Sequence, residues 1–360
     1  MLYIYTNSSA GYRQFMPFIN YFEKENLDYL CLYEGELDVK EKNNRIKQVN
    51  FLNSFKAANK ANSSNDDVYF ITGTFMNFLK SMIIKRFINA KTYLIFRTRG
   101  IVPEESYLRN QSNIRFEILS YIEKYCLKKS DFILTVSEAQ MEHYIKKYNI
   151  KEDKVFVVHN FLNHWQYKRQ SIEKNEIPSV VYVGSYNKWQ RADDILKLFK
   201  KIKEKMESVK FIVCTQKHHI EIFDRIAKEN NICVQIESHD YSNLIKRISS
   251  MTAGIIMRSD EIVNRVSSPF KIIDYISSGI PFIMTDNIGD YSRIFKDTDF
   301  VNIINDKESY SEQDIDTIIE FINKNLDRNS DEIIRFAKKN LDFSKEMSKV
   351  TFLKEEIACK

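Results

Sequence analysis

The sequence has few of the residues that interrupt or cross-link a chain. Its 360 residues include 8 Gly and 5 Pro, too few for a collagen-like chain, a long linker or a many-turned β-sandwich. The 5 Cys are widely spaced and form no CxxC pair, so we expect reduced thiols, no disulfide framework and no zinc site. This cysteine usage is typical of a cytoplasmic protein.

Long apolar segments are also missing. No uncharged run reaches the roughly 18–20 residues that a membrane span needs. The sequence starts with MLYIYTNSS, without a basic stretch or a small-residue cleavage site, so we expect no signal peptide. With 43% apolar and 29% charged residues the composition is that of a globular protein, and the length predicts two domains.

The net charge of +5 hides one basic window. Between Lys80 and Lys129, eleven Lys or Arg face four Glu, a surplus of seven. Residues 75–91 predict a helix with a broad apolar face and a basic flank of Lys80, Lys85 and Arg86, which suits contact with anionic lipid headgroups. An ordinary core-facing helix with solvated lysines is the alternative, and the spacing alone favours it. The window carries no nucleic-acid-binding signature, so we expect no nucleic-acid partner.

Short β-branched or aromatic runs alternate with helical patterns along almost the whole chain. The expected strands are residues 2–6, 28–33, 68–72, 92–96, 132–136, 154–158, 179–183, 210–214, 232–236, 254–257, 280–284 and 300–303. Apolar strands between helices predict parallel sheets covered on both faces, as in doubly wound α/β domains. The polar stretch 160–179 interrupts the alternation. We therefore expect Rossmann-like domains at 1–165 and 166–342 that face each other across a cleft, and a helix in 343–360 that packs back on the first domain.

The most specific segment is RVSSPFKIIDYISSGIPFIMTDNIGD, residues 265–290. Ser267 or Ser268 is a suitable N-cap, Pro269 suits the first helical position, and Gly279 would end the helix before a buried strand. A helix that starts after such a loop presents free N–H groups and a positive dipole end, which suits a diphosphate.

Two charged side chains near the start of this helix fit the same ligand. Lys271 could add positive charge, and Asp274, a turn further on, could accept hydrogen bonds from ribose hydroxyls. A capped βα unit without a ligand would explain the cap and the apolar face, although it gives no reason for Lys271 and Asp274.

A second segment, VVYVGSYNKWQRADDIL, follows the pattern of a strand, a small-residue turn and a helix. Gly184 and Ser185 end the strand, and Lys188 and Arg191 precede the helix. Such a turn allows close backbone approach to a phosphate, which the two cations could neutralise. Any βα turn can carry Gly and Lys, so this segment alone is weak evidence for a phosphate site. Together with residues 265–290 it indicates one.

Four segments in this order resemble glycosyltransferase family 4, the retaining enzymes of the GT-B fold. GSYNKWQR and, some eighty residues later, SSPFKIIDYISSGIP are similar to its donor half. IFRTRGIVPEE and EKYCLKKSDFILTVSEAQMEHY are similar to segments of capsule and O-antigen transferases. The resemblance covers most of the chain.

The resemblance implies a GT-B fold and transfer of a sugar, with retention, from a UDP- or GDP-linked donor, without a metal or cofactor. The implied acceptor is a glycan or a polyprenyl-linked glycan of a bacterial surface polysaccharide, modified in the cytoplasm at the inner face of the plasma membrane. A non-catalytic GT-B subunit that binds a partner transferase is the alternative. A nicotinamide-dependent dehydrogenase is disfavoured because no GxGxxG is present.

The resemblance also implies roles for residues. The residues assigned to the donor diphosphate are Gly11, Ser185, Lys188, Arg191, Ser267, Ser268 and Lys271. Asp274 takes the place of the family Glu that holds the ribose, whereas Val266 replaces a second Glu near the sugar. Ser8 and Ser9 would face the acceptor. Arg99 and Glu105 are the catalytic or acceptor-contacting candidates, with a local salt bridge between them as the alternative.

Overall fold

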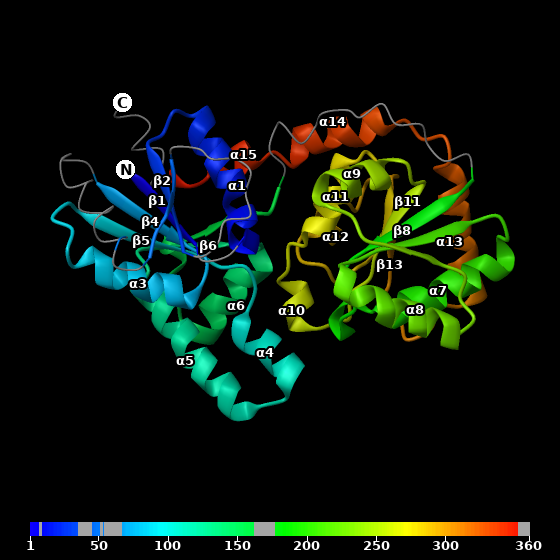
Figure 1. The fold of residues 1–360 in the computed structure, drawn as a ribbon, viewed down its shortest axis with the longest axis horizontal. Helices are drawn as coiled ribbons and strands as arrows, with labels where there is room; N and C mark the ends of the chain where they lie inside the picture. Colours follow the sequence, from blue (N-terminus) through cyan, green and yellow to red (C-terminus); the bar gives the residue numbers. More distant parts are fainter. Residues whose placement is uncertain (7–8, 35–44, 51–52, 54–66, 162–176, 352–360) are drawn as a thin grey trace. The chain divides into compact units, whose positions relative to one another are not determined.

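The computed structural model describes residues 1–6, 9–34, 45–50, 53, 67–161 and 177–351. The chain divides into two compact units, each built around its own sheet (Figure 1). Unit 1 comprises residues 1–163 and 343–360, and unit 2 comprises residues 164–342. Among the described residues, no helix combines the length and the apolar character that a membrane crossing requires.

The sheet of unit 1 has seven parallel strands in the order β3-β2-β1-β4-β5-β6-β7. Its strands are β1 (Leu2–Thr6), β2 (Tyr29–Tyr33), β3 (Ile46–Gln48), β4 (Val68–Thr72), β5 (Thr92–Arg97), β6 (Phe132–Thr135) and β7 (Val155–Val157). Every residue of β1, β2 and β4 is buried, because a parallel sheet is covered on both faces.

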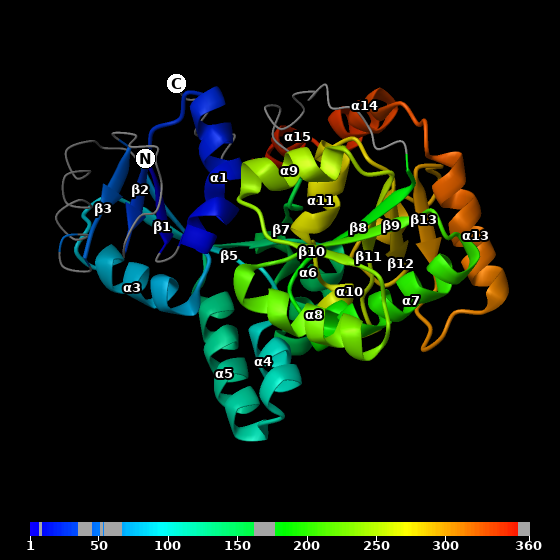
Figure 2. The same ribbon diagram turned by 45° about the vertical axis from the view of Figure 1, so that its right-hand side comes forward.

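Six helices of unit 1 matter here. They are α1 (Ser9–Lys24), α3 (Phe75–Lys85), α4 (Val102–Asn110), α5 (Asn113–Lys129), α6 (Glu138–Tyr148) and α15 (Phe343–Met347). Helices α4 and α5 run side by side and project from the rest of the unit (Figures 1 and 2). Helix α15 packs on α1, where the rings of Phe343 and Phe18 lie 5.0 Å apart. Next to this contact, His159 Nδ1 lies 2.7 Å from Glu346 Oε2.

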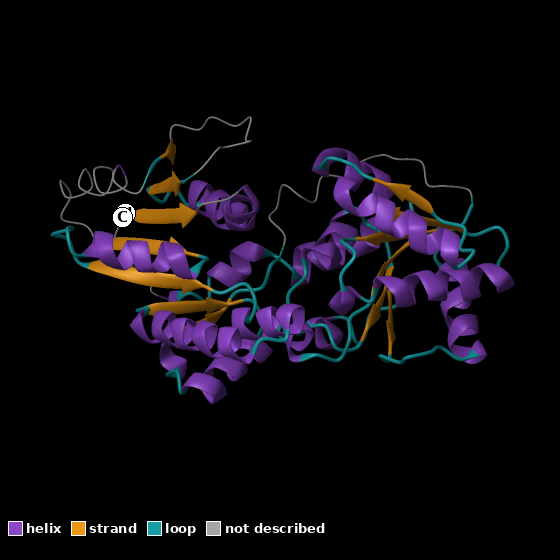
Figure 3. Ribbon diagram, turned by 60° about the horizontal axis from the view of Figure 1, so that its bottom comes forward, coloured by secondary structure: helices purple, strands orange, loops and turns teal. Residues whose placement is uncertain are grey.

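The sheet of unit 2 has six parallel strands in the order β10-β9-β8-β11-β12-β13, with helices on both faces (Figure 3). Its strands are β8 (Ser179–Val183), β9 (Lys210–Cys214), β10 (Gln235–Glu237), β11 (Ala253–Ile256), β12 (Phe282–Thr285) and β13 (Val301–Ile304). Its helices are α7 (Ala192–Lys205), α8 (Ile220–Glu229), α9 (Tyr241–Ser249), α10 (Ile262–Arg265), α11 (Phe270–Ser277), α12 (Tyr291–Ile294), α13 (Glu312–Lys324) and α14 (Ser330–Asn340).

Most of the expected strands are confirmed within a residue or two. Strand β3, a half-exposed IKQ segment, was not expected, because it lacks an apolar run. Strand β10 begins three residues later than expected, since the Ile232 amide donates to the Ala227 carbonyl at 2.8 Å and still belongs to the end of α8. The two sheets share one topology, and the strand order reverses between β1 and β4 and between β8 and β11. In open parallel sheets ligands bind at the carboxyl ends of the strands beside such a switch point.

Candidate active site

At the switch point of unit 2, a glycine and an arginine follow the two neighbouring strands. Gly184 comes directly after β8, and Arg258 follows β11 and is only 8% exposed. The Arg258 amide donates to Thr285 Oγ1 at 3.0 Å, and the same hydroxyl lies 3.2 Å from the Arg258 carbonyl oxygen. These bonds fix the backbone that carries a buried cation at the carboxyl edge of the sheet.

Lys271, in the first turn of α11, reaches across to the turn after β8. Its ammonium lies 4.7 Å from the centre of the Tyr182 ring, 3.5 Å from the Tyr182 hydroxyl, and in contact with Gln190 Oε1. A Cβ at position 184 would overlap this ammonium, so Gly184 is the residue that leaves room for it. The contact connects the two segments that the sequence analysis singled out.

The environment of Lys271 opposes its positive charge. Burial is the main cause that lowers the pKa of its ammonium well below the ordinary lysine value, and the charge of Arg258 is the second. Asp274 acts in the opposite direction. Two buried cations whose charges repel at the end of a sheet form a site that a bound anion would stabilise.

Asp274 lies one turn further along α11. It is 9% exposed, and burial raises the pKa of its carboxyl to about 7, against the opposing effects of Tyr241 and Lys271. The Tyr241 hydroxyl, from the first residue of α9, donates to Asp274 Oδ1 at 3.1 Å. The carboxylate therefore already accepts a hydroxyl hydrogen bond, the contact that a ribose would offer.

The start of α11 differs from the expectation. Pro269 is the N-cap and the helix begins at Phe270, so the predicted capping by Ser267 or Ser268 is wrong. The Ser267 amide and hydroxyl both donate to the Asn264 carbonyl, at 3.1 and 2.8 Å, and Ser268 Oγ lies 3.0 Å from the Tyr291 hydroxyl. The predicted helix stop is confirmed, since Gly279 has a φ of +67° after α11.

The structure does not bring Arg191 to the cation pair. Its Nε donates to Asp194 at 2.8 Å, and the guanidinium forms a second ion pair with Asp306. It thereby connects the start of α7 to the segment after β13. Ser185 does lie beside the pair, because its carbonyl oxygen is 3.0 Å from the Tyr182 hydroxyl. The backbone of Lys188 begins a short 3₁₀ helix, and its side chain lies outside the described residues.

Val266, which stands where the resemblance implies a Glu, is fully buried at the end of α10. The neighbouring Asp260 does not replace that Glu, since it pairs with Arg265 at 2.6 and 2.7 Å on the surface.

In unit 1, Arg99 follows β5 near the switch point of the sheet. Its guanidinium lies 5.4 Å from the centre of the Phe15 ring of α1, and a Cβ at Gly73 would come within 2.5 Å of its Nη2. Burial lowers the pKa of Arg99 to about 10, and its buried Nε makes no hydrogen bond to any residue that the structure describes. Arg97 precedes it, and burial, then Arg99, lower the pKa of Arg97 to about 9.

The loop after Arg99 is fixed by buried polar side chains of α5 and α6. The Gly100 carbonyl accepts hydrogen bonds from Gln140 Nε2 and from the Tyr144 hydroxyl, both at 2.9 Å. Glu123 accepts from the Tyr148 hydroxyl at 2.8 Å, and burial raises the pKa of its carboxyl to about 7. Glu105 lies in the first turn of α4, and its carboxylate lies over Gly100, where a Cβ would overlap it. The two catalytic candidates thus lie on either side of this fixed loop.

The remaining predicted residues of unit 1 have mixed placements. Ser8 lies outside the described residues, and Ser9 and Gly11 occupy the first turn of α1, where only the backbone is described. Lys80 pairs with Glu34, and Lys85 pairs with Asp131 at 3.2 Å, whereas Arg86 is exposed at the end of α3.

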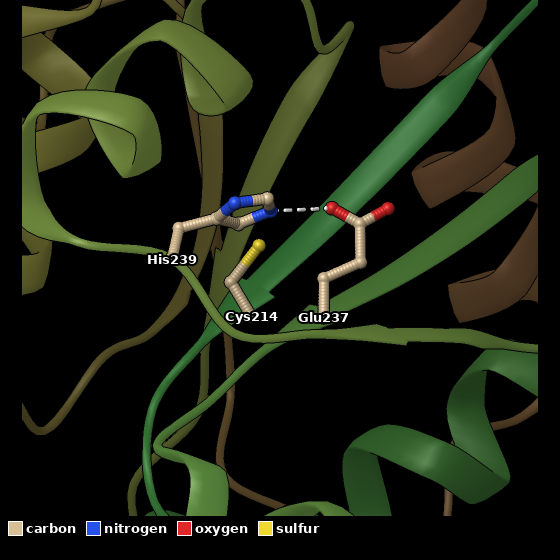
Figure 4. A group of neighbouring side chains, drawn as sticks. All are labelled: Cys214, Glu237 and His239. Atoms are coloured by element: carbon tan, nitrogen blue, oxygen red, sulfur yellow. Dashed lines mark hydrogen bonds and ion pairs between the residues drawn. The ribbon is translucent and has the colours of Figure 1, made fainter.

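One further group of polar side chains lies at the carboxyl ends of β9 and β10. Cys214, Glu237 and His239 point toward one another, with possible ligand atoms within 4.8 Å (Figure 4). Glu237 accepts hydrogen bonds from Arg247 at 2.8 and 2.9 Å and lies 2.8 Å from His239 Nε2. Arg247 is the main cause that lowers the pKa of Glu237, whereas burial raises the pKa of the Cys214 thiol to about 12. Hydrogen bonds thus already occupy the carboxylate, and the expectation of no metal stays a prediction.

The two parallel α/β units define the GT-B fold, which solved structures share. Anabaena HepE, in complex with UDP and glucose, aligns with a TM-score of 0.72 and 10% identity over 99% of this chain and 100% of that chain. The lipopolysaccharide outer core galactosyltransferase WaaB aligns with a TM-score of 0.66 and 14% identity over 98% and 100%.

A variant of S. aureus TarM, in complex with Fondaparinux, α-GlcNAc-glycerol and UDP, gives a TM-score of 0.62 and 13% identity over 83% of this chain. This chain spans 57% of the TarM chain. No family model matches the sequence, and no curated protein matches it. The structural neighbours are GT-B glycosyltransferases, so the predicted fold class is confirmed.

Proposed function

We propose that this protein is a retaining glycosyltransferase that takes a sugar from a UDP- or GDP-linked donor. The observation that carries the proposal is the pair of cations, Arg258 and Lys271, at the switch point of unit 2. Complexes of HepE with UDP and with UDP-glucose support a uridine diphosphate donor.

The paired cations suit the departure of a nucleoside diphosphate. Negative charge develops on the diphosphate as the sugar leaves, and fixed cations in a poorly hydrated place stabilise that charge. Asp274 would orient the ribose, and Gly184 and Ser185 would let the backbone approach the phosphates. This chemistry needs no metal, so activity should persist in a chelator.

For the acceptor we propose only a class: a glycan or a lipid-linked glycan of a surface polysaccharide, at the inner face of the plasma membrane. WaaB, a lipopolysaccharide galactosyltransferase, and TarM, with its bound glycerol glycoside, support this class. Arg99 and Glu105 would contact the acceptor or the transferred sugar.

The test is calorimetric binding of UDP and GDP, followed by release of nucleotide from a panel of donors. Lys271→Met should weaken UDP binding by at least about tenfold, because each charge-assisted hydrogen bond contributes about 1.5–3 kcal/mol. Lys217→Met, which removes an exposed charge of the same unit, is the matched control. Equal UDP binding by both variants and the unaltered protein would refute the donor site.

The buried Val266 keeps a second candidate in view, a non-catalytic GT-B subunit. Tight UDP binding without nucleotide release from any donor and acceptor would favour that subunit.

A further inference from the structure

A line of large apolar side chains lies exposed along α5. The apolar stripe consists of Ile114 (77% exposed), Ile118 (56%), Tyr121 (72%) and Tyr125 (38%). Steps of four, three and four residues keep these side chains on one face of a helix. Glu123, Cys126 and Leu127 of the same helix are buried against unit 1. Helix α5 is therefore apolar on two faces, of which unit 1 covers only one.

Basic residues border the apolar stripe. The basic flank consists of Arg115, Lys124, Lys128 and Lys129, all exposed. Glu117 is the single exposed acid of the helix. None of the four basic side chains forms an ion pair with an acid in the described part of the chain. Lys129 Nζ lies 6.0 Å from the centre of the Tyr125 ring, so charge and apolar surface adjoin.

Helix α3, which contacts α5, carries a shorter stripe of the same kind. Met76 and Ile83 of α3 are 57% and 46% exposed, seven residues apart, and Phe87 in the turn after the helix is 60% exposed. Its lysines differ from those of α5, because Lys80 and Lys85 already pair with acids of unit 1. Among the described ion pairs, α3 is thus left with Arg86 alone, whereas all four cations of the basic flank of α5 have no acidic partner.

Single exposed apolar residues are ordinary, but a continuous line of them marks an interaction surface. A second copy docked on this face would bring basic flank against basic flank, which opposes association. An anionic lipid surface fits both features, since tyrosines and aliphatic side chains enter the headgroup boundary while lysines meet the lipid charge. We propose that α5 docks unit 1 on an anionic membrane surface through the apolar stripe and its basic flank.

The test is flotation of the purified full chain with phosphatidylcholine vesicles, with and without phosphatidylglycerol. The protein should bind the anionic vesicles at least about tenfold more tightly, and added salt should reduce the difference. Lys124→Glu with Lys128→Glu should abolish the preference for anionic vesicles. Lys146→Glu with Lys151→Glu makes the same change in net charge elsewhere in unit 1 and should bind normally.

Ile118→Ser with Tyr121→Ser should weaken binding to both kinds of vesicle by at least about tenfold. Both residues are exposed, so circular dichroism should show an intact fold. Equal binding to the two kinds of vesicle, or normal binding by the α5 variants, would overturn the proposal. Self-association that the Ile118→Ser, Tyr121→Ser variant abolishes, without vesicle binding, would overturn it in favour of a second copy. The proposal does not depend on the donor site, since UDP binding without vesicles should be unchanged in every α5 variant.

Discussion

Arg258 and Lys271 lie close enough at the end of the second sheet for the arginine to lower the pKa of the lysine. Arg258 follows β11, and Lys271 lies in the first turn of α11. The pairing of β11 with β8 and β12 and the packing of α11 on β11 fix the positions of both backbones. Asp274 offsets the repulsion between the two cations only partly. Its pKa is raised to about 7, so near neutral pH its carboxyl is negatively charged for only part of the time. The two cations thus repel each other, and a bound diphosphate would offset that repulsion.

The first prediction is a fall in UDP affinity with rising pH. A cation binds phosphate only while it is protonated, and the pKa of Lys271 is well below the ordinary lysine value of about 10.4. Affinity should therefore decline in a pH range where an exposed lysine would still be charged. Calorimetric titration between pH 6 and pH 10 measures this, and a flat profile across the range would contradict it.

The second prediction separates the two cations. Arg258→Met removes one positive charge from the proposed diphosphate site. UDP binding at neutral pH should therefore weaken by about tenfold. The substitution also removes a repulsion, so the pH at which Lys271 loses its proton should move upward. The same titration shows both effects. A weaker affinity with an unmoved pH midpoint would mean that the two side chains act independently.

The third prediction contrasts two glycines. Gly184→Ala places a Cβ against the Lys271 ammonium and the buried Tyr182 hydroxyl. UDP affinity should fall about tenfold, and the free energy of unfolding should fall by about 1–3 kcal/mol because both groups must shift. Gly279→Ala forces a side chain into a φ of +67° and should cost about 1–2 kcal/mol. Urea unfolding and UDP titration of both variants check the pair. The prediction fails if Gly184→Ala loses stability rather than affinity.

The fourth prediction concerns stability and pH. The pKa of Glu123 is raised from 4.5 to about 7 in the folded state, so the native chain holds a proton that the unfolded chain releases. Stability should then fall as pH rises from about 4.5 to about 7, by about 3 kcal/mol for this group.

Glu123→Gln should flatten that fall, because Gln has no charge to bury. The exposed Glu117→Gln on the same helix is the control and should keep the pH dependence of the unaltered protein. Urea unfolding at pH 5 and pH 8 compares the three. Indistinguishable slopes for Glu123→Gln and Glu117→Gln would refute the assignment.

The strands could be predicted from sequence because each is a short apolar run between polar helices. Their order could not, since β8 and β11 are neighbours only through the crossover that separates them by some seventy residues. Without the strand order, nothing indicated that the residue after β11 lies beside Gly184. No glycine or other local signal marks the end of β11 either, so the sequence did not point to Arg258. Lys271 was found because a turn signal and the family resemblance coincide on its segment.

Long-range partners account for the other differences. Arg191 is near Gly184 in sequence, but its guanidinium forms an ion pair with Asp306 in the segment after β13. Lys80 has the spacing of a surface cation, yet its partner Glu34 comes from the end of β2. A periodic pattern also cannot tell which of the two apolar faces of α5 is covered.

The contact of α15 with α1 has a consequence for synthesis. Phe343 and Glu346 complete the surroundings of Phe18 and His159, yet the whole of unit 2 separates them in the chain. A ribosome must therefore finish unit 2 before Phe343 and Glu346 can pack against Phe18 and His159 in unit 1. Unit 2, a continuous segment, is free to fold first, and the unit that begins the chain is the last to be completed.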